Sequence, residues 1–321
     1  MRKSVAIQKA TTPDKAVVSS CARSSANKQK RIKMLTIFCD SDMDITPEVA
    51  ARYGFKLISM PYSLNGVTVF PYETPMPELH AFYDGLRAGD LPTTSGVSEE
   101  KYKQYFRPEF EKGNDILYVH FSAAMSCTFE AMNNAVAELK SEFPERRFYT
   151  IDTKGITIIS YAIACEIGDM YIAGASLDDI LKWASVEVDK FAQYFFADDL
   201  KFFKRSGRVS GFAAIMGNLI GIRPIIYMTP DGKMVSLSKE RGRARALNRL
   251  LSYMEELGED IDKHRIIIGH TDAPEMAAEL KNMIIEKFGD GLDIVTITTN
   301  PTSGSHCGPD GVGVAFHCKH R

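Results

Sequence analysis

The sequence predicts an α/β fold made of two α/β domains, and three observations predict it. Segments with the composition of buried strands alternate with helical segments from residue 34 to about residue 155, which is typical of a parallel sheet with helices on both faces. The pattern then changes, and strands, hairpins and helices follow up to residue 321. A chain of 321 residues also has the length of two medium-sized domains. We therefore expect an N-terminal domain over 34–155 with a parallel sheet and a C-terminal α/β domain over 156–321.

The elements of the first half follow from strand patterns and helix caps. Thr46 and Ser98 are the expected N-caps of two helices, and Gly54 ends the first of them. The other expected elements are strands over 34–40, 115–121 and 146–152, a hairpin around residues 65–66, and helices over 77–87 and 128–140.

The second half mixes helices, hairpins and strands. Helices are expected over 156–188, 243–257 and 274–288, and strands over 191–197, 264–270 and 292–298. A short helix, a turn at Gly207-Arg208 and an apolar helix precede a hairpin around Asp231-Gly232. We expect residues 302–316 to form a glycine-rich loop that runs into a last strand.

The charge is unevenly distributed. Residues 1–33 carry nine Lys or Arg against one acid, a charge of +8, so the remaining residues carry −10 of the total of −2. This segment lacks the apolar core of a signal peptide, and we interpret it as a disordered basic extension. An organellar transit peptide or a nucleic-acid-binding arm is the alternative. The acidic remainder argues against nucleic-acid binding by the folded part.

Two further features bear on location. The sequence contains no apolar run near the roughly 18 residues of a membrane span. Its six cysteines form no CxxC pair. We therefore expect reduced thiols and a cytoplasmic protein.

Polar loops follow or precede the expected strands of the first half, where ligand sites of open α/β sheets form. We expect three of them to converge on one crevice: Asp40–Asp44, Thr93–Ser95 and Ser122–Thr128. Hydroxyl side chains gather there at two expected helix starts: Thr94, Ser95, Ser126 and Thr128. Hydroxyl groups and the free N–H groups of a helix start bind a carboxylate or phosphate well. The same side chains also serve as ordinary helix caps, and spacing alone leaves both interpretations open.

Other motifs are weaker. The sequence contains no G-x-S-x-G elbow, no Walker A motif and no H-E-x-x-H motif. The alternating acids Asp40, Asp42 and Asp44 lack the spacing of a calcium loop, so we expect turn and cap roles for them. Histidines and cysteines near the C-terminus match no standard zinc spacing, so we expect no metal: His306, Cys307, His317, Cys318 and His320.

A basic stretch stands out in the second half. It is either a solvated face or a surface that docks an anion or a partner. Its members are Lys201, Lys204, Arg205, Arg208, Arg223, Lys239, Arg241, Arg243 and Arg245.

Taken together, these segments resemble the DegV family from about Met34 to Phe316. The order and spacing of seven segments carry the resemblance: "DSDMDIT", "LPTTSGVSEEKY", "FSAAMSCTFEAM", "IDTKGIT", "LKFFKRSGRVSGFAAIMGNLIGIRPII", "DGKMVSLSKERGRARA" and "SHCGPDGVGVAF". The resemblance implies the two-domain EDD fold with a fatty acid held between the domains. It also implies that the protein is not an enzyme by itself, but presents the fatty acid to a separate ATP-dependent fatty acid kinase in phospholipid metabolism.

The resemblance also implies roles for individual residues, with no cofactor and no metal. The carboxylate would be bound by Thr94, Ser95, Ser126, Thr128 and His306. The candidates that line the tail are Phe195, Phe196, Ile215, Leu219 and Ile220, from the expected "YFFA" strand and apolar helix. The kinase-facing surface would contain Arg205, Arg208 and Lys239.

Two residues depart from the family pattern. Cys127 replaces the Gly of the usual "SGT", and Asp310 replaces the last Gly of the usual "GPG". We expect Asp310 to point away from a bound carboxylate, because two like charges repel one another. Two other functions stay open: an enzyme subunit of a related α/β fold in which His306 holds a small hydroxy-ketone, and an interaction module whose lipid is structural.

Overall fold

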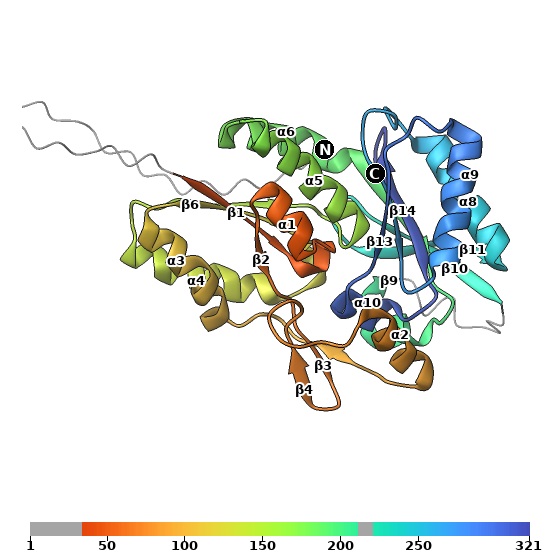
Figure 1. Cartoon of the computed structure of the whole chain (residues 1–321), viewed down its shortest axis with the longest axis horizontal. Coiled ribbons are helices and arrows are strands. Elements are labelled where there is room, and N and C mark those ends of the chain that lie inside the picture. Colours follow the sequence, from red (N-terminus) through yellow and green to blue (C-terminus); the bar gives the residue numbers. More distant parts are fainter. Residues whose placement is uncertain (1–33, 211–220) are drawn as a thin grey trace, which may run out of the picture.

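The computed structural model describes residues 34–210 and 221–321. Its first half contains a four-stranded parallel sheet in the order β2-β1-β6-β7. These strands span Lys56–Ile58, Leu35–Asp40, Asp115–His120 and Phe148–Asp152. Helices α3 (Glu99–Lys112) and α4 (Thr128–Glu142) pack together beside it, and α1 (Pro47–Tyr53) packs on α5 (Ile158–Ile172) on the other side (Figure 1). The expected parallel sheet is therefore confirmed.

The second half contains a seven-stranded mixed sheet in the order β13-β12-β14-β8-β10-β11-β9. Helices α8 (Arg243–Leu257) and α9 (Pro274–Phe288) cover one face, and α5 contacts β8, β12 and β14 on the other (Figure 1). In the order of the sheet, the strands span Ile294–Thr298, Ile266–His270, Val312–His317, Phe191–Phe196, Ile222–Met228, Met234–Arg241 and Val209–Ser210.

Helix α5 lies between the two sheets because its surface is apolar nearly all round. Ten of its residues are buried, as expected for a helix covered on several sides. Gly269 in β12 permits close packing here, since a Cβ atom at this position would lie 2.3 Å from Cγ2 of Ile158. Helix α6 (Leu177–Glu187) and the short η3 (Val188–Lys190) then lead into β8.

A small antiparallel sheet, β4-β3-β5, projects from the first half. Its strands span Val67–Val69, Tyr62–Leu64 and Thr93–Thr94, and α2 (Leu79–Ala88) lies between β4 and β5 in the chain. Helix α2 does not stay within the first half. Its buried residues share a cluster with Phe202 of α7 (Lys201–Ser206), and it contacts α10 (Pro301–Cys307). The two halves of the chain are therefore packed together along this edge as well (Figure 1).

One expected element is wrong. Residues 301–307 form helix α10, not a glycine-rich loop. Asn300 caps this helix through a bond from the Ser303 N–H, and Pro301 occupies its first position, which favours a helix start. Glycine and serine in this segment are weak helix formers, so the sequence did not predict the helix.

Two further expectations concern residues outside the described part of the chain: the basic extension (1–33) and most of the apolar helix (211–220). Within the described ranges, none of the helices combines the length and the apolar character that a membrane crossing requires.

Candidate functional site

A cavity lies where the carboxyl ends of the parallel sheet meet the second half of the chain. All three loops expected to converge contribute to it: Asp42 from the first, Thr94 and Ser95 from the second, and Ser126 and Cys127 from the third. Its other polar lining includes Thr157, Gln193, Arg208, His270, Thr271, Thr299, Thr302, Ser303 and His306. Its apolar lining includes Met60, Phe121, Met125, Ile156, Ile158, Phe195, Ala197, Met234 and Val312.

His306 and Thr94 join the two halves at this cavity. The Thr94 hydroxyl, in β5, lies 2.8 Å from Nε2 of His306, in α10. Burial, and then the nearby charges of Arg208 and Arg205, lower the pKa of His306 to about 4. The imidazole is therefore neutral near pH 7 and offers one donor and one acceptor.

Ser126 stands at the start of α4 and has two roles. Its Oγ accepts a bond from the Thr128 N–H at 3.2 Å, so it satisfies the first N–H of the helix, although Cys127 occupies the N-cap position. Its hydroxyl proton is not engaged by that bond, and Ser126 lines the cavity. Capping and ligand binding are therefore compatible at this residue.

Thr128 is placed differently. It is buried, and its hydroxyl accepts a bond from the Val97 N–H at 2.9 Å and lies 3.1 Å from the hydroxyl of Tyr102. It does not line the cavity. Thr128 fixes α4 against the loop that carries Ser95, so it does not belong in the carboxylate set that the sequence predicted.

The three basic residues expected at a docking surface occupy different positions. Arg208 lines the cavity, which the sequence reasoning missed. Arg205 donates to the carbonyls of Leu91 and Pro92, so it supports the segment that leads to Thr94. Lys239 is exposed on β11. All three residues are exposed, but Lys239 neither lines the cavity nor supports the segment that leads to Thr94.

The tail-lining candidates also differ from one another. Phe195 and Phe196 both border the cavity. The Phe195 side chain belongs to the core cluster on the α5 side, and that of Phe196 belongs to the cluster beneath α8 and α9, because successive strand residues face opposite sides. Phe195 is therefore the stronger candidate. Ile215, Leu219 and Ile220 lie outside the described residues.

The two departures from the family pattern have clear positions. Cys127 is exposed and lines the cavity, where Cys307 also lies. Asp310 points toward α2, and its carboxylate lies 3.0 Å from Nη2 of Arg87. As expected, Asp310 does not face the cavity, whose lining resumes at Gly311.

Two of the three acids of the first loop bridge elements, as turn residues do. Asp40 accepts bonds from the Phe121 N–H and the Tyr118 hydroxyl, both at 3.1 Å. Asp44 accepts from the N–H and the side-chain amide of Asn300 at 2.8 and 2.7 Å, and so holds the start of α10. Burial raises the pKa of each carboxyl group to about 7, and these bonds oppose the shift.

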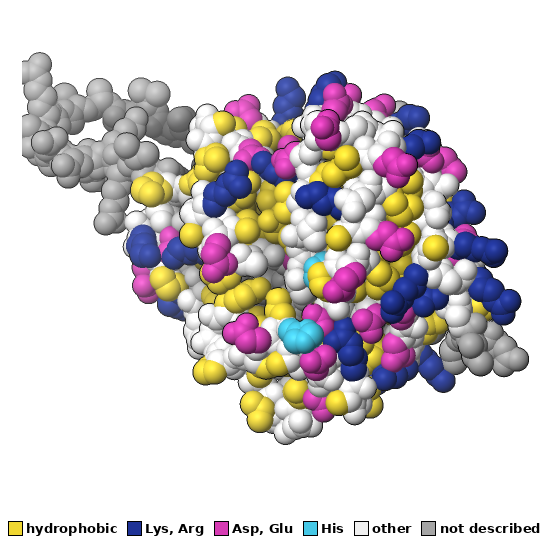
Figure 2. All heavy atoms as spheres, turned by 45° about the vertical axis from the view of Figure 1, so that its right-hand side comes forward, with side chains coloured by type: hydrophobic (Ala, Val, Ile, Leu, Met, Phe, Trp, Pro, Cys, Tyr) yellow, Lys and Arg dark blue, Asp and Glu magenta, His cyan; other side chains and the backbone are white. Residues whose placement is uncertain are grey.

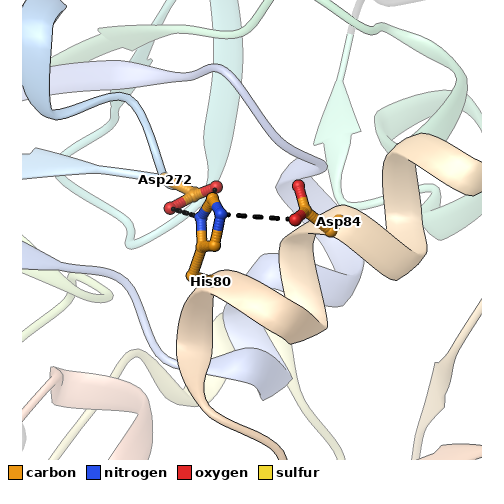
Figure 3. Close-up of side chains that lie close together, drawn as sticks. All are labelled: His80, Asp84 and Asp272. Atoms are coloured by element: carbon orange, nitrogen blue, oxygen red, sulfur yellow. Dashed lines mark hydrogen bonds and ion pairs between the residues drawn. The ribbon is translucent and has the colours of Figure 1, made fainter.

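A group with the geometry of metal ligands occurs at another place. Over 34–210 and 221–321 it consists of His80, Asp84 and Asp272 (Figure 3). Arg87 already bonds both acids, with Nη1 at 2.9 Å from Asp84 and 2.5 Å from Asp272. The cluster is therefore an ion-pair network between α2 and the loop after β12, and it carries no metal assignment.

The fold and sequence are similar to those of known proteins. The profile described as "uncharacterised protein, DegV family" matches residues 34–319. A DegV domain-containing protein of Clostridium perfringens is 28% identical over 285 residues, 89% of this chain and 98% of the relative.

Solved structures agree in fold. A DegV family protein from Thermus thermophilus, described by its fatty acid binding, has a TM-score of 0.78 at 22% identity and covers 89% of this chain and 99% of its own. A stearic acid-binding protein from Eubacterium ventriosum has a TM-score of 0.79 at 21% identity, with the same coverage. The fold is thus confirmed, and the profile match over nearly all of the described residues shows that this chain belongs to the DegV family.

Proposed function

We propose that this protein binds one long-chain fatty acid in the cavity and presents its carboxylate to a separate ATP-dependent fatty acid kinase. The observation that carries the proposal is the arrangement of the cavity lining. Hydroxyl groups, a neutral imidazole and a guanidinium group meet where β5, α4 and α10 adjoin, and apolar side chains form much of the remaining wall.

The carboxylate site consists of Thr94, Ser95, Ser126 and His306, with Arg208 nearby. A carboxylate removed from water needs hydrogen-bond donors or a compensating charge. The hydroxyl groups of Ser95 and Ser126 supply donors. In the tautomer with its proton on Nε2, His306 donates to Oγ1 of Thr94, and the Thr94 hydroxyl then donates to the ligand. Arg208 supplies the charge.

The tail supplies most of the affinity. Each buried methylene contributes roughly 0.8 kcal/mol, so a 16-carbon tail contributes on the order of 10 kcal/mol before the costs of association. Each charge-assisted hydrogen bond adds about 1.5–3 kcal/mol. The head-group residues therefore set orientation, and the apolar wall that includes Phe195 and Ile158 sets affinity.

Relatives support this ligand class. The E. ventriosum protein is described as binding stearic acid, and a DegV family protein from Eubacterium eligens is described as loaded with heptadecanoic acid. Both acids are saturated chains with one carboxylate, and the cavity offers polar groups for the carboxylate and apolar side chains for the tail.

The kinase would dock on the basic face that contains Arg205, Arg208 and Lys239, in the second half of the chain. Figure 2 shows Lys and Arg side chains gathered there among acidic ones. Lys239 lies on this half and is exposed. A basic face increases the rate of encounter with a partner whose docking surface is acidic.

A head-group comparison tests the proposal. Delipidated protein is titrated with hexadecanoic acid and with hexadecan-1-ol, which has the same tail. We expect one acid per chain and at least a tenfold weaker alcohol, since the alcohol lacks the charge that Arg208 complements. Equal affinity for the acid and the alcohol would contradict the carboxylate site. If the protein binds neither compound, the proposed lipid binding is wrong.

A further inference from the structure

A second polar patch lies on the cavity wall, on elements other than those that carry Thr94, Ser126 and His306. It consists of Asp42 in η1 (Ser41–Met43), Thr157 before α5 and Gln193 in β8. The Thr157 N–H donates to the backbone carbonyl of Asp42 at 2.8 Å. Nε2 of Gln193 lies 3.4 Å from Oγ1 of Thr157. The three residues therefore adjoin one another, although they come from three parts of the chain.

Gln193 interrupts an apolar row. The residues that share its face of β8 are Phe191 and Phe195, and both belong to the core cluster on the α5 side, as does Ala197 directly after the strand. Gln193 itself is 3% exposed. Its Oε1 is buried and has no hydrogen-bond partner among residues 34–210 and 221–321. A buried amide oxygen without a donor is unfavourable, so this position favours a ligand that brings one.

Asp42 has the same character. It is 7% exposed, and its Oδ1 is buried without a partner in the described ranges. Burial, and then the carboxyl groups of Asp40 and Asp44, raise the pKa of Asp42 well above its usual range. The raised pKa favours the protonated carboxyl group, which is both a donor and an acceptor.

We propose that the cavity selects fatty acids that carry a hydroxyl group along the chain, and that Gln193 and Asp42 bind this hydroxyl; the inference rests on the proposed fatty-acid binding. The hydroxyl donates to Oε1 of Gln193, and the Asp42 carboxylic acid donates to the hydroxyl oxygen. A plain methylene chain satisfies neither group. Sites that hydrogen-bond a ligand hydroxyl reject the analogue that lacks it, because their buried polar groups then stay unpaired.

Water is the competing partner for these atoms. A buried water that bonds both Gln193 and Asp42 would satisfy them beside an unsubstituted chain. The two cases differ in which ligand binds more tightly, because a retained water gives no advantage to a hydroxylated acid.

The test is a positional series. Dissociation constants are measured for hexadecanoic acid and for its monohydroxy isomers along the chain, with the parent protein, Gln193→Met and Tyr62→Phe. Methionine keeps the length of the side chain without the amide. Tyr62→Phe is the matched control, since the Tyr62 hydroxyl is also buried and unpartnered among the described residues but does not line the cavity.

We expect one position, or two adjacent ones, at which the hydroxylated acid binds the parent about tenfold more tightly than the other isomers, the gain typical of a well-paired buried hydroxyl. Gln193→Met loses that preference and binds hexadecanoic acid more tightly than the parent does, because the unpaired amide oxygen is gone, and Tyr62→Phe behaves as the parent. The inference is overturned if the parent binds every hydroxylated isomer more weakly than hexadecanoic acid, or if Gln193→Met retains the preference. Either result leaves fatty-acid binding intact. If Gln193→Met does not fold, Asp42→Ala replaces it under the same criteria. Binding of no acid at all refutes the proposed function itself, and the inference with it.

Discussion

The Thr94 hydroxyl lies 2.8 Å from Nε2 of His306, although the two residues are 212 positions apart in the chain. Thr94 belongs to the small sheet of the first half, and His306 to a helix of the second. The contact places a hydroxyl and a neutral imidazole side by side on the wall of the cavity. Two halves of one chain thus build one polar cluster, and this cluster is the basis of the first two predictions.

Thr94→Val should weaken fatty acid binding, because it removes the hydroxyl and leaves His306 without its partner. We expect a loss of about tenfold, typical of one buried hydrogen bond. Thr94→Ser keeps the hydroxyl and should bind nearly as the parent does. Titration calorimetry with hexadecanoic acid measures both variants, and equal losses for valine and serine would assign the effect to packing.

Ser126→Ala should lower both stability and affinity, since Ser126 accepts a bond from the first N–H of α4 and also lines the cavity. The lost bond to the Thr128 N–H costs about 1 kcal/mol of unfolding free energy. Combining it with Thr94→Val should cost a few kcal/mol of binding free energy, more than either change alone. Melting temperature and affinity are measured on the same double variant. A lower melting temperature with unchanged affinity would show that these hydroxyls are only caps.

Asp44→Asn should change how stability depends on pH. Burial raises the pKa of Asp44 to about 7, whereas an unfolded Asp titrates near 3.9. Protonated Asp44 therefore stabilises the folded parent below about pH 4, and this stabilisation is lost as the pH rises to about 7. Asparagine keeps an acceptor for Asn300 and does not titrate. Relative to the variant, the parent should lose on the order of a few kcal/mol between pH 4 and pH 8, and parallel denaturation curves across this range would contradict the assignment.

Lys239→Glu should weaken coupling to a fatty acid kinase and leave fatty acid affinity unchanged, because Lys239 is exposed and does not line the cavity. The defect should be largest at low salt, where charge steering is strongest. Acyl phosphate formation is followed over a salt series with the kinase of a DegV-containing bacterium. Arg205→Glu is a poorer probe, since Arg205 also holds the carbonyls of Leu91 and Pro92. Identical rates for Lys239→Glu and the parent at every salt concentration would rule Lys239 out of the docking surface.

Local signals predicted most of the fold. The capping residues Thr46 and Ser98 and the terminating Gly54 are where they were expected, and the helices over 243–257 and 274–288 begin and end at the expected residues. Each depends on interactions within one or two turns, which a sequence displays directly. Helix α10 was missed because glycine and serine are weak helix formers, and its start depends on Asn300, which tertiary contacts with Asp44 hold in place.

The site was predictable in part for the same reason. Loops at strand ends predicted that Thr94, Ser95 and Ser126 would converge, and the structure brings them to one cavity. Arg208 and Thr128 were misplaced because the direction of a side chain depends on what packs around it. Gln193 gave a usable signal, a polar residue inside the strand "FAQYFFA", but its orphan oxygen appears only when the surrounding core is known.

The lipid content of the purified protein tests the central claim most directly. The protein is produced in a bacterial host, measured by native mass spectrometry, and then denatured so that its ligand can be extracted and identified. We expect one fatty acid of about 14–18 carbons per chain, which adds roughly 230–280 Da to the intact mass, because a tail of this length gains most from the apolar wall. Protein that carries no stoichiometric lipid, and that also takes up no fatty acid when one is supplied, would contradict the account.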